Sequence, residues 1–467
     1  MTAGRLAFCL ALSGCVGFAE RRIEGEVPRG PAAQMGERPP RPPAQPPAAE
    51  ALAQMQQGGR VSLVRLIDFA LRTSPVTRAT WSDSRAAAAL VGSRRSAWYP
   101  EIDVVGGYAY SHQVLSQATT FNLKDWNTGA QLNWLVLDAG GRSADISEAR
   151  ALLAVANDAH DQTVQDLILQ VEQAYTQYQA ARALRTSQES SVHEARIAYE
   201  AAEALRGEGL ATVADVLQAK TALSQAELNL AQVEGQVVVL RGSVATAVGV
   251  PPTVAIEPED LPETDVSRQL GRVEDLIAQA ERERPDLARA RAQAVAARSH
   301  ADAVRWRGWP KLVLTGSAFR LWFVTPGYPD GNTFAAALQL QFPLFTGFRD
   351  SYDAAQAQEQ ANAAAARAES FEQQAILSVW SSYQGVQTAA QRVRTARDLL
   401  ASASQSAEVA QGRYKEGVGS ILDLLVAQSA LASARAQEVQ ARADWLLALA
   451  SLAHDTGSLG TSQGGSQ

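Results

Sequence analysis

The sequence lacks the features that mark the commonest functional classes. No apolar run reaches the roughly 18 residues of a membrane-spanning helix, and only two cysteines, Cys9 and Cys15, occur among 467 residues. The net charge is −7, so the chain has no basic footprint for nucleic acid. No nucleophile motif or phosphate-binding loop occurs. We therefore expect no enzymatic activity, no cofactor and no nucleic-acid partner, and any membrane crossing must occur without helices.

Histidine is scarce as well. The five histidines are scattered without metal-ligand spacing, and we expect them to be solvated residues on helix faces: His112, His160, His193, His300 and His454. The sequence therefore predicts no metal site.

The first residues are typical of a targeting signal. Leu12-Ser13-Gly14-Cys15 follows a short apolar stretch and resembles a bacterial lipobox. This pattern predicts a signal peptide over residues 1–14 and lipidation of Cys15. An ordinary signal peptide cleaved after Ala19 is the alternative. Since Cys9 leaves with either signal, disulfides within the mature monomer and cysteine-based metal sites are excluded.

Low-complexity segments flank the body of the chain. Eight of the 19 prolines lie between Pro28 and Pro47, so residues 15–60 are expected to form a lipidated, extended tether. The Gly/Ser/Gln-rich segment 458–467 is expected to be disordered.

The body repeats itself at an offset of about 208 residues, which aligns Gly209 with Gly417. A period of this length is too long for a solenoid and indicates a duplicated half-molecule. We place the first repeat at residues 61–258 and the second at 259–457.

Each repeat contains one very long predicted helix. Ser143–Leu205 and Ser351–Arg413 have no proline, and apolar residues recur at helical spacing. A helix of about 63 residues is about 95 Å long, which indicates a coiled coil or a helical barrel. Shorter helices are expected at Val76–Ala97, Val213–Ala247, Asp286–Arg305 and Ile421–Ala453. Two of these laid end to end would have nearly the length of one long helix.

Each repeat also contains a predicted β-hairpin. The four strands are expected at residues 101–111, 126–137, 311–322 and 334–343, with loops of about 14 and 11 residues. One face is apolar with aromatic ends, as in a transmembrane β-strand, and is expected to face lipid through Trp126, Leu132, Trp134, Phe334, Leu338, Leu340 and Phe342. A soluble sheet with one buried face alternates in the same way. Since bacterial barrels start at about eight strands, a membrane barrel would require more than one copy of the chain: two copies would give a plugged barrel, and three would give twelve strands around a water-filled lumen.

The doubled plan resembles the TolC family of outer membrane factors. The resemblance covers about residues 61–457. It rests on the spacing from Gly209 to Asp215, on the same spacing from Gly417 to Asp423, and on two turns that follow the strands, Asp138–Arg142 and Phe345–Arg349. It implies a homotrimer in the bacterial outer membrane, with a twelve-stranded barrel and a twelve-helix periplasmic tunnel, and the lipobox adds a lipid anchor at Cys15. It also implies two partners, a periplasmic adaptor and an inner-membrane pump of the RND or ABC type.

The resemblance also assigns two groups of residues. It implies adaptor docking at Gly209, Leu210, Gly417 and Val418, and a periplasmic gate at Asp215, Tyr414 and Asp423. Gly419 and Val426 replace gate residues of the best-known member, so we expect a less firmly closed gate. Plain helix turns at the glycines, and helix capping by Asp215 and Asp423, are the alternatives.

The function expected from the resemblance is passive export of cargo. Drug efflux, metal efflux and type I protein secretion remain open. A lipid-anchored periplasmic coiled-coil scaffold without a pore is the main alternative, and a passive porin is another.

Overall fold

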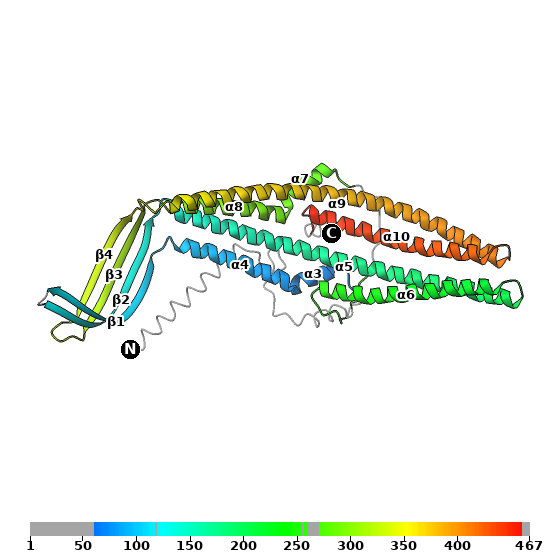
Figure 1. Ribbon diagram of the computed structural model, residues 1–467, viewed down its shortest axis with the longest axis horizontal. Coiled ribbons are helices and arrows are strands. Elements are labelled where there is room, and N and C mark those ends of the chain that lie inside the picture. Colours follow the sequence, from blue (N-terminus) through cyan, green and yellow to red (C-terminus); the bar gives the residue numbers. More distant parts are fainter. Residues whose placement is uncertain (1–59, 117–118, 255, 260–269, 460–467) are drawn as a thin grey trace. The chain divides into compact units, whose positions relative to one another are not determined.

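The computed structural model describes residues 60–116, 119–254, 256–259 and 270–459 (Figure 1). The predicted signal peptide, the lipidation of Cys15, the tether before Arg60 and the tail beyond Leu459 lie outside these residues and stay predictions. Leu459 itself is buried at 4% exposure, so the expected disordered tail does not begin at residue 458.

The helices occur in pairs of equal length, one in each repeat. α3 and α7 have 11 residues, α4 and α8 have 22, α5 and α9 have 67, and α6 and α10 have 35. In chain order they are α3 (Leu63–Thr73), α4 (Pro75–Ser96), α5 (Gly141–Gly207), α6 (Val213–Ala247), α7 (Val273–Glu283), α8 (Pro285–Trp306), α9 (Arg349–Lys415) and α10 (Ile421–Asp455). This pairing agrees with the duplication seen in the sequence.

The helices α3 and α7 were not predicted. Each is a short amphipathic segment that ends two residues before a proline, Pro75 or Pro285. Proline disfavours the helical conformation of the residue before it, and Ser74 and Arg284 have extended ψ values of 126° and 115°. A new helix therefore begins at each proline. None of the helices in the described part of the chain is long and apolar enough to cross a membrane.

The chain divides into two compact units, and each unit draws on both repeats. Apart from a segment outside the described residues, the first unit comprises Asp83–Asn157 and Arg289–Ser370 and contains the sheet. The second comprises the described parts of Pro28–Ser82, Asp158–Ala288 and Phe371–Gln467.

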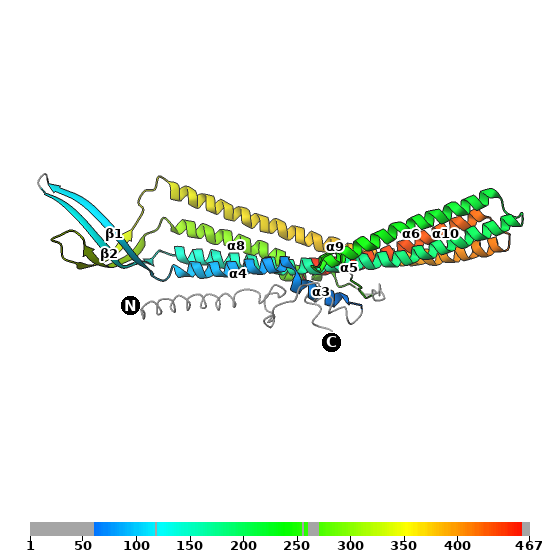
Figure 2. The same cartoon turned by 90° about the horizontal axis from the view of Figure 1, so that it is seen from below.

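The second unit is helical. Within it, α6 lies beside the C-terminal part of α5, and α10 lies beside that of α9, so that two helical hairpins end in two tips (Figures 1 and 2). Its largest apolar cluster includes Leu66, Ile168, Val171, Val244 and Ile256, from α3, α5, α6 and the segment after α6.

The first unit contains one four-stranded antiparallel sheet in the order β1-β2-β3-β4. The strands are β1 (Glu101–Ser116), β2 (Thr119–Leu137), β3 (Lys311–Phe323) and β4 (Gly331–Gln341). Both hairpins have shorter connections than predicted. The polar residues near the first turn break the side-chain alternation, but the backbone pairing continues to Ser116 and Thr119.

Phe342 was predicted to lie inside the last strand, and this is wrong. β4 ends at Gln341, and Phe342 is followed by Pro343. Proline has no N–H group to donate, so the ladder of backbone hydrogen bonds stops there.

Candidate membrane-facing sheet and helical tips

The register of the sheet places most of the predicted lipid-facing residues on one face. Trp126 pairs with Tyr108 and Trp322, Leu132 with Ile102, and Leu338 with Leu314. Since side chains alternate between the two faces, these residues share a face with Trp134, Phe334 and Leu340. The opposite face carries Asn127, Gln131, Asn133, Gln339 and Gln341.

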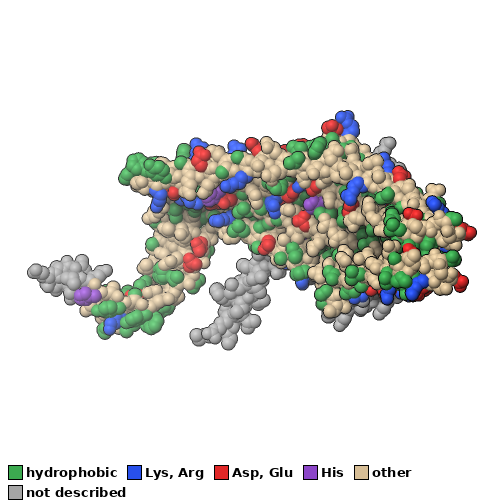
Figure 3. Space-filling view, turned by 45° about the vertical axis from the view of Figure 1, so that its right-hand side comes forward, with side chains coloured by type: hydrophobic (Ala, Val, Ile, Leu, Met, Phe, Trp, Pro, Cys, Tyr) green, Lys and Arg blue, Asp and Glu red, His purple; other side chains and the backbone are tan. Residues whose placement is uncertain are grey.

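The apolar face is not covered by other parts of the described chain. Among the strand residues whose side chains are described, no hydrophobic residue is buried. Phe334 and Leu340 are 79% and 71% exposed. Figure 3 shows hydrophobic side chains gathered at the surface of the sheet. A soluble sheet with one face buried by its own chain is therefore excluded for the described residues.

The two helical tips are built in the same way. α5 and α9 each end in a Schellman motif, with Gly209 and Gly417 at positive φ values of 76° and 71°. Leu210 N donates to Leu205 O at 2.8 Å, and Val418 N donates to Arg413 O at 3.0 Å. The expectation that these glycines end the helices is confirmed, since a positive φ favours glycine.

Each tip presents an apolar side chain to solvent. Leu210 and Val418 follow the two glycines and are 77% and 69% exposed. The first two turns of α6 and α10 add further exposed side chains, Val213, Leu217, Leu422 and Val426. Sequence reasoning did not select Val213, Leu217 or Leu422, although their apolar character beside a turn was a usable signal.

Of the predicted gate residues, Asp215 caps α6. Its carboxylate accepts hydrogen bonds from the Thr212 N–H and hydroxyl, both at 2.8 Å, and its own N–H donates to Thr212 Oγ1 at 3.2 Å. These bonds form a capping box, and the Thr212 N–H bond is the main cause that lowers the pKa of Asp215. The capping alternative therefore holds for this residue.

Asp423 is the counterpart of Asp215 in α10, but its carboxylate accepts no capping hydrogen bond among the described residues. Ser420 accepts from the Asp423 N–H at 3.1 Å and caps the helix. The Asp423 side chain is exposed, and its carboxylate has no hydrogen bond or ion pair within the described residues. Capping by its side chain does not account for this aspartate.

Tyr414 lies in an apolar cluster that joins the two tips. The cluster includes Ala202 of α5, Val216 of α6, and Ile421 and Leu424 of α10. The Tyr414 hydroxyl is buried and has no hydrogen-bond partner among the described residues. Burial, followed by the charge of Asp215, raises the pKa of Tyr414. The TolC resemblance also implies a link between Tyr414 and Asp215 that keeps the gate shut, but the Tyr414 hydroxyl makes no hydrogen bond to Asp215 here.

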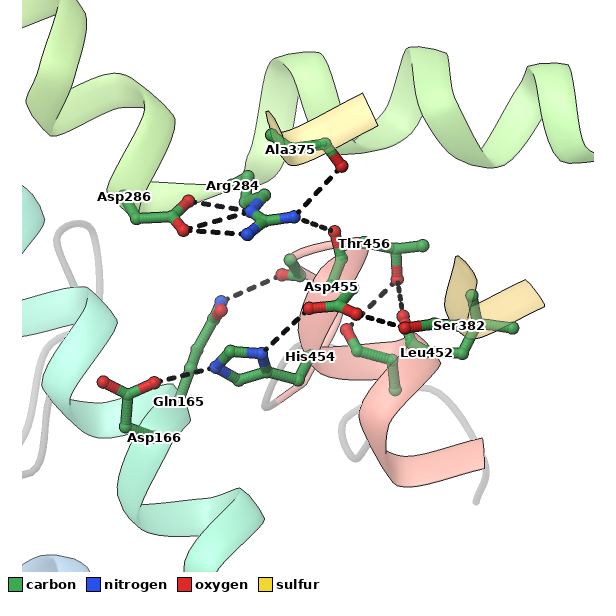
Figure 4. A network of polar contacts seen from close by, with 12 residues as sticks. Gln165, Asp166, Arg284, Asp286, Ala375, Ser382, Leu452, His454, Asp455 and Thr456 are labelled. Carbon is green, nitrogen blue, oxygen red and sulfur yellow. Dashed lines mark hydrogen bonds and ion pairs between the residues drawn. The ribbon is translucent and has the colours of Figure 1, made fainter. Parts of the chain in front are cut away.

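A polar network at the end of α10 was missed by sequence reasoning (Figure 4). His454 Nε2 lies 2.8 Å from Asp166 of α5, and His454 Nδ1 lies 3.5 Å from Asp455. Ser382 of α9 donates to Asp455, and Arg284 Nη1 donates to the Asp455 carbonyl at 3.2 Å. Arg284 also forms a largely buried ion pair with Asp286 at 2.9 Å. The network connects α5, α9 and α10 to Arg284, which lies between α7 and α8, and to Asp286 of α8.

The histidines are not all solvated, as had been expected. His160 is fully buried, and its Nδ1 lies 2.9 Å from the Thr80 hydroxyl. His454 is part of the network. The hydrogen bonds to Asp166 and then to Asp455 raise the pKa of His454 to about 9. Spacing along the sequence could not reveal this, because Asp166 and His454 are 288 residues apart.

The raised pKa of His454 predicts a pH-dependent stability. The folded-state pKa of about 9 exceeds the ordinary value of 6.5, so the protonated imidazole stabilises the fold fully below about pH 6.5. This contribution is lost as the pH rises through about 9. The thermal unfolding midpoint should therefore fall between pH 6.5 and 9.5 by several degrees more in the wild-type protein than in His454→Gln. Circular dichroism measures both, and equal falls would contradict the role given to His454.

Comparisons with known proteins agree with this architecture. The family model "Outer membrane efflux protein" matches residues 66–250 and 276–458, one segment in each repeat. The chain is 30% identical over 398 residues to Protein CyaE of Bordetella pertussis, covering 81% of this chain and 80% of that protein. It is 26% identical over 420 residues to the outer membrane efflux protein BepC of Brucella suis, covering 88% and 89% of the two chains.

The fold also matches solved structures. The outer membrane protein VceC of Vibrio cholerae superposes with a TM-score of 0.75 at 20% identity, covering 88% of this chain and 99% of VceC. These matches confirm the fold class expected from the TolC resemblance, a helical barrel with a β-domain. Since the family model covers most of the chain and both repeats, this protein belongs to the outer membrane efflux protein family.

Proposed function

We propose that the helical tips hold both the adaptor-docking surface and the narrowest point of this export channel. As a family member, the chain is an outer-membrane channel that extends into the periplasm, and it acts as a homotrimer. It works with a periplasmic adaptor and an inner-membrane pump. Export through it is passive conduction, and the energy comes from the pump.

One observation supports the location of the narrow point. Asp423 is an exposed carboxylate without a partner in the described chain, in the first turn of α10. In a trimer, three copies near the axis form a ring of negative charge, which makes a pore prefer cations. Its counterpart Asp215 is held in a capping box, so the two repeats contribute unequally to this ring.

A second observation supports docking at the tips. Leu210 and Val418 are exposed apolar residues that the Schellman glycines hold at the ends of rigid helical hairpins. A side chain at residue 417 or 209 would meet no atom within 4 Å of its Cβ, so the surface beside each glycine is open. An adaptor can therefore approach the backbone closely at both turns.

The sheet supports the membrane assignment. Among the described residues its apolar face is uncovered, its other face carries amides, and its outer strands β1 and β4 have free edges. Lipid does not tolerate open edges, and three copies provide the twelve strands that close them. A coiled-coil scaffold without a pore has no use for such a face, and family membership does not support that alternative.

The proposed narrow point predicts the effect of removing Asp423. Trimers of Asp423→Ala in planar bilayers should lose much of the cation preference of the wild-type channel, because the ring of three carboxylates is gone. The conductance of the variant should differ from that of the wild type mainly at low salt, because at high salt the ions screen the field of the three carboxylates. Reversal potentials in a salt gradient measure the preference.

A matched control is available at the same tip. Glu416 is an exposed acid in the turn before α10, and Glu416→Ala removes the same charge. We expect this control to keep the ion preference. If Asp423→Ala keeps both conductance and ion preference, Asp423 does not line the narrow point.

A further inference from the structure

We propose that the apolar face of the sheet carries a binding site for a phosphorylated lipid of the outer leaflet. Arg320 and Lys124 would hold the phosphate groups, and a hollow beside Ala318 would hold an acyl chain. The proposal rests on the lipid-facing orientation given to this face under the proposed function.

Charge is segregated between the two faces of the sheet. All three acids of the strands, Glu101, Asp103 and Asp125, lie on the amide-rich face by the register. Arg320 and Lys124 lie on the apolar face, which carries no acid among the described strand residues. A face in contact with neutral lipid alone has no use for cations, whereas anionic headgroups attract them.

Both cations lie near the hairpin end of the sheet. The helices leave the other end, so in a channel whose helices extend into the periplasm the hairpins face the exterior. The apolar face spans ten residue steps from Leu312 to Trp322. At about 3.3 Å per residue and a tilt of about 40°, this is about 25 Å, the height of the apolar band of a membrane barrel. Arg320 and Lys124 therefore lie at the outer border of that band.

Aromatic rings hold both side chains. The guanidinium of Arg320 lies 5.9 Å from the ring centre of Trp322, which is two residues closer to the hairpin, so the side chain reaches toward the exterior. Arg320 Nη1 donates to Asn332 Oδ1 at 3.1 Å. Lys124 Nζ lies 5.8 Å from the ring centre of Tyr110. These partners are neutral, so no acid within the described residues compensates either positive charge.

A shallow, open hollow of about 520 Å³ is lined mostly by apolar atoms, and Arg320 lies just beyond its lining residues. Seven of its ten lining residues belong to the apolar face, among them the small residues Ala130, Gly316, Ala318 and Ala336. Ala318 lies two residues from Arg320 on the same face. A cation above an apolar hollow fits a ligand with an acidic head and a hydrocarbon tail. Free inorganic phosphate would contact only Arg320 and Lys124 and would leave the hollow empty.

The test measures lipid binding to the whole trimer in detergent. Bisphosphorylated lipid A is added to delipidated trimers, and bound lipid is counted by native mass spectrometry. We expect the double variant Arg320→Gln/Lys124→Gln to bind at least tenfold more weakly than the wild type. Ala318→Phe, which fills the hollow and keeps both charges, should also weaken binding. Lys311→Gln, on the amide-rich face at the other end of β3, is the control and should bind like the wild type.

Three outcomes would overturn the proposal: equal lipid binding by the wild type and the double variant, equal binding of dephosphorylated lipid A, or full competition by inorganic phosphate. The proposed function is tested separately. A nitroxide attached to Leu338→Cys should be accessible to oxygen and shielded from a water-soluble relaxation agent in lipid bilayers. If this label is lipid-exposed and lipid A binding is unchanged in the double variant, only the lipid site is wrong. If the label is water-exposed, the orientation of the sheet is wrong.

Discussion

Replacing Gly417 with tryptophan is expected to reduce export to the level of cells that lack the channel, while trimers remain in the outer membrane. Gly417 has a φ of 71° in the turn between α9 and α10, and no atom lies within 4 Å of a Cβ at this position. A large side chain therefore points into open space beside the exposed Val418 and obstructs the proposed docking surface. Cells complemented with each variant measure export, and heat-modifiable migration of the outer-membrane fraction measures the trimer.

Two controls separate docking from folding. Gly417→Ala carries the same positive-φ strain, about 1 kcal/mol, with little bulk, and should keep most of the export. A benzophenone side chain at Val418 should crosslink the adaptor in the wild-type background and lose this crosslink in Gly417→Trp. Full export by Gly417→Trp would refute docking at this tip. Loss of the trimer in both Gly417 variants would show that the glycine serves folding.

Replacing Gly457 with alanine is expected to destabilise the second unit strongly. Gly457 ends α10 with a φ of 76°, and a Cβ there would lie 2.7 Å from the C and O atoms of Glu283 and 2.9 Å from Arg284 N. All three are backbone atoms at the end of α7, so the contact cannot be relieved by a side-chain rotation. This close contact adds to the strain of the positive φ, so we expect the free energy of unfolding to fall by about 3 kcal/mol or more. The thermal unfolding midpoint followed by circular dichroism measures this loss.

The first repeat provides the matched control for this prediction. Gly249 ends α6 in the same way, with a φ of 82°, but the nearest atom to its Cβ is Thr73 Oγ1 at an ordinary 3.4 Å. Gly249→Ala should therefore cost only the strain of the positive φ, about 1 kcal/mol. Similar midpoints for the two variants would show that the close approach to Glu283 relaxes without cost.

Apart from α3 and α7, the described helices could be predicted from the sequence because their signals are local. α6 begins at Val213 and ends at Ala247 as predicted, since Thr212 caps its start and Gly249 follows its end. The strand ends were harder to predict. Side-chain alternation stops before the first hairpin turn, whereas backbone pairing does not depend on side chains and continues.

The candidate site was only partly predictable, because repeated residues do not have repeated partners. Asp215 and Asp423 occupy equivalent positions, yet only Asp215 accepts capping bonds through its carboxylate. The network around His454 joins residues from four distant segments. At the end of α6 the residues equivalent to His454, Asp455 and Thr456 are Thr246, Ala247 and Val248, so the second repeat's ionisable groups have no counterpart there. Such pairings depend on tertiary packing and leave no pattern in the sequence.

An electron cryomicroscopy structure of the protein in lipid nanodiscs tests the central claim most directly. We predict three chains around one continuous axial opening, with Trp134 and Leu338 against lipid and the tips of α5, α6, α9 and α10 at the periplasmic end. An assembly without an axial opening, in which Trp134 and Leu338 pack inside a dry protein interior, would contradict the account.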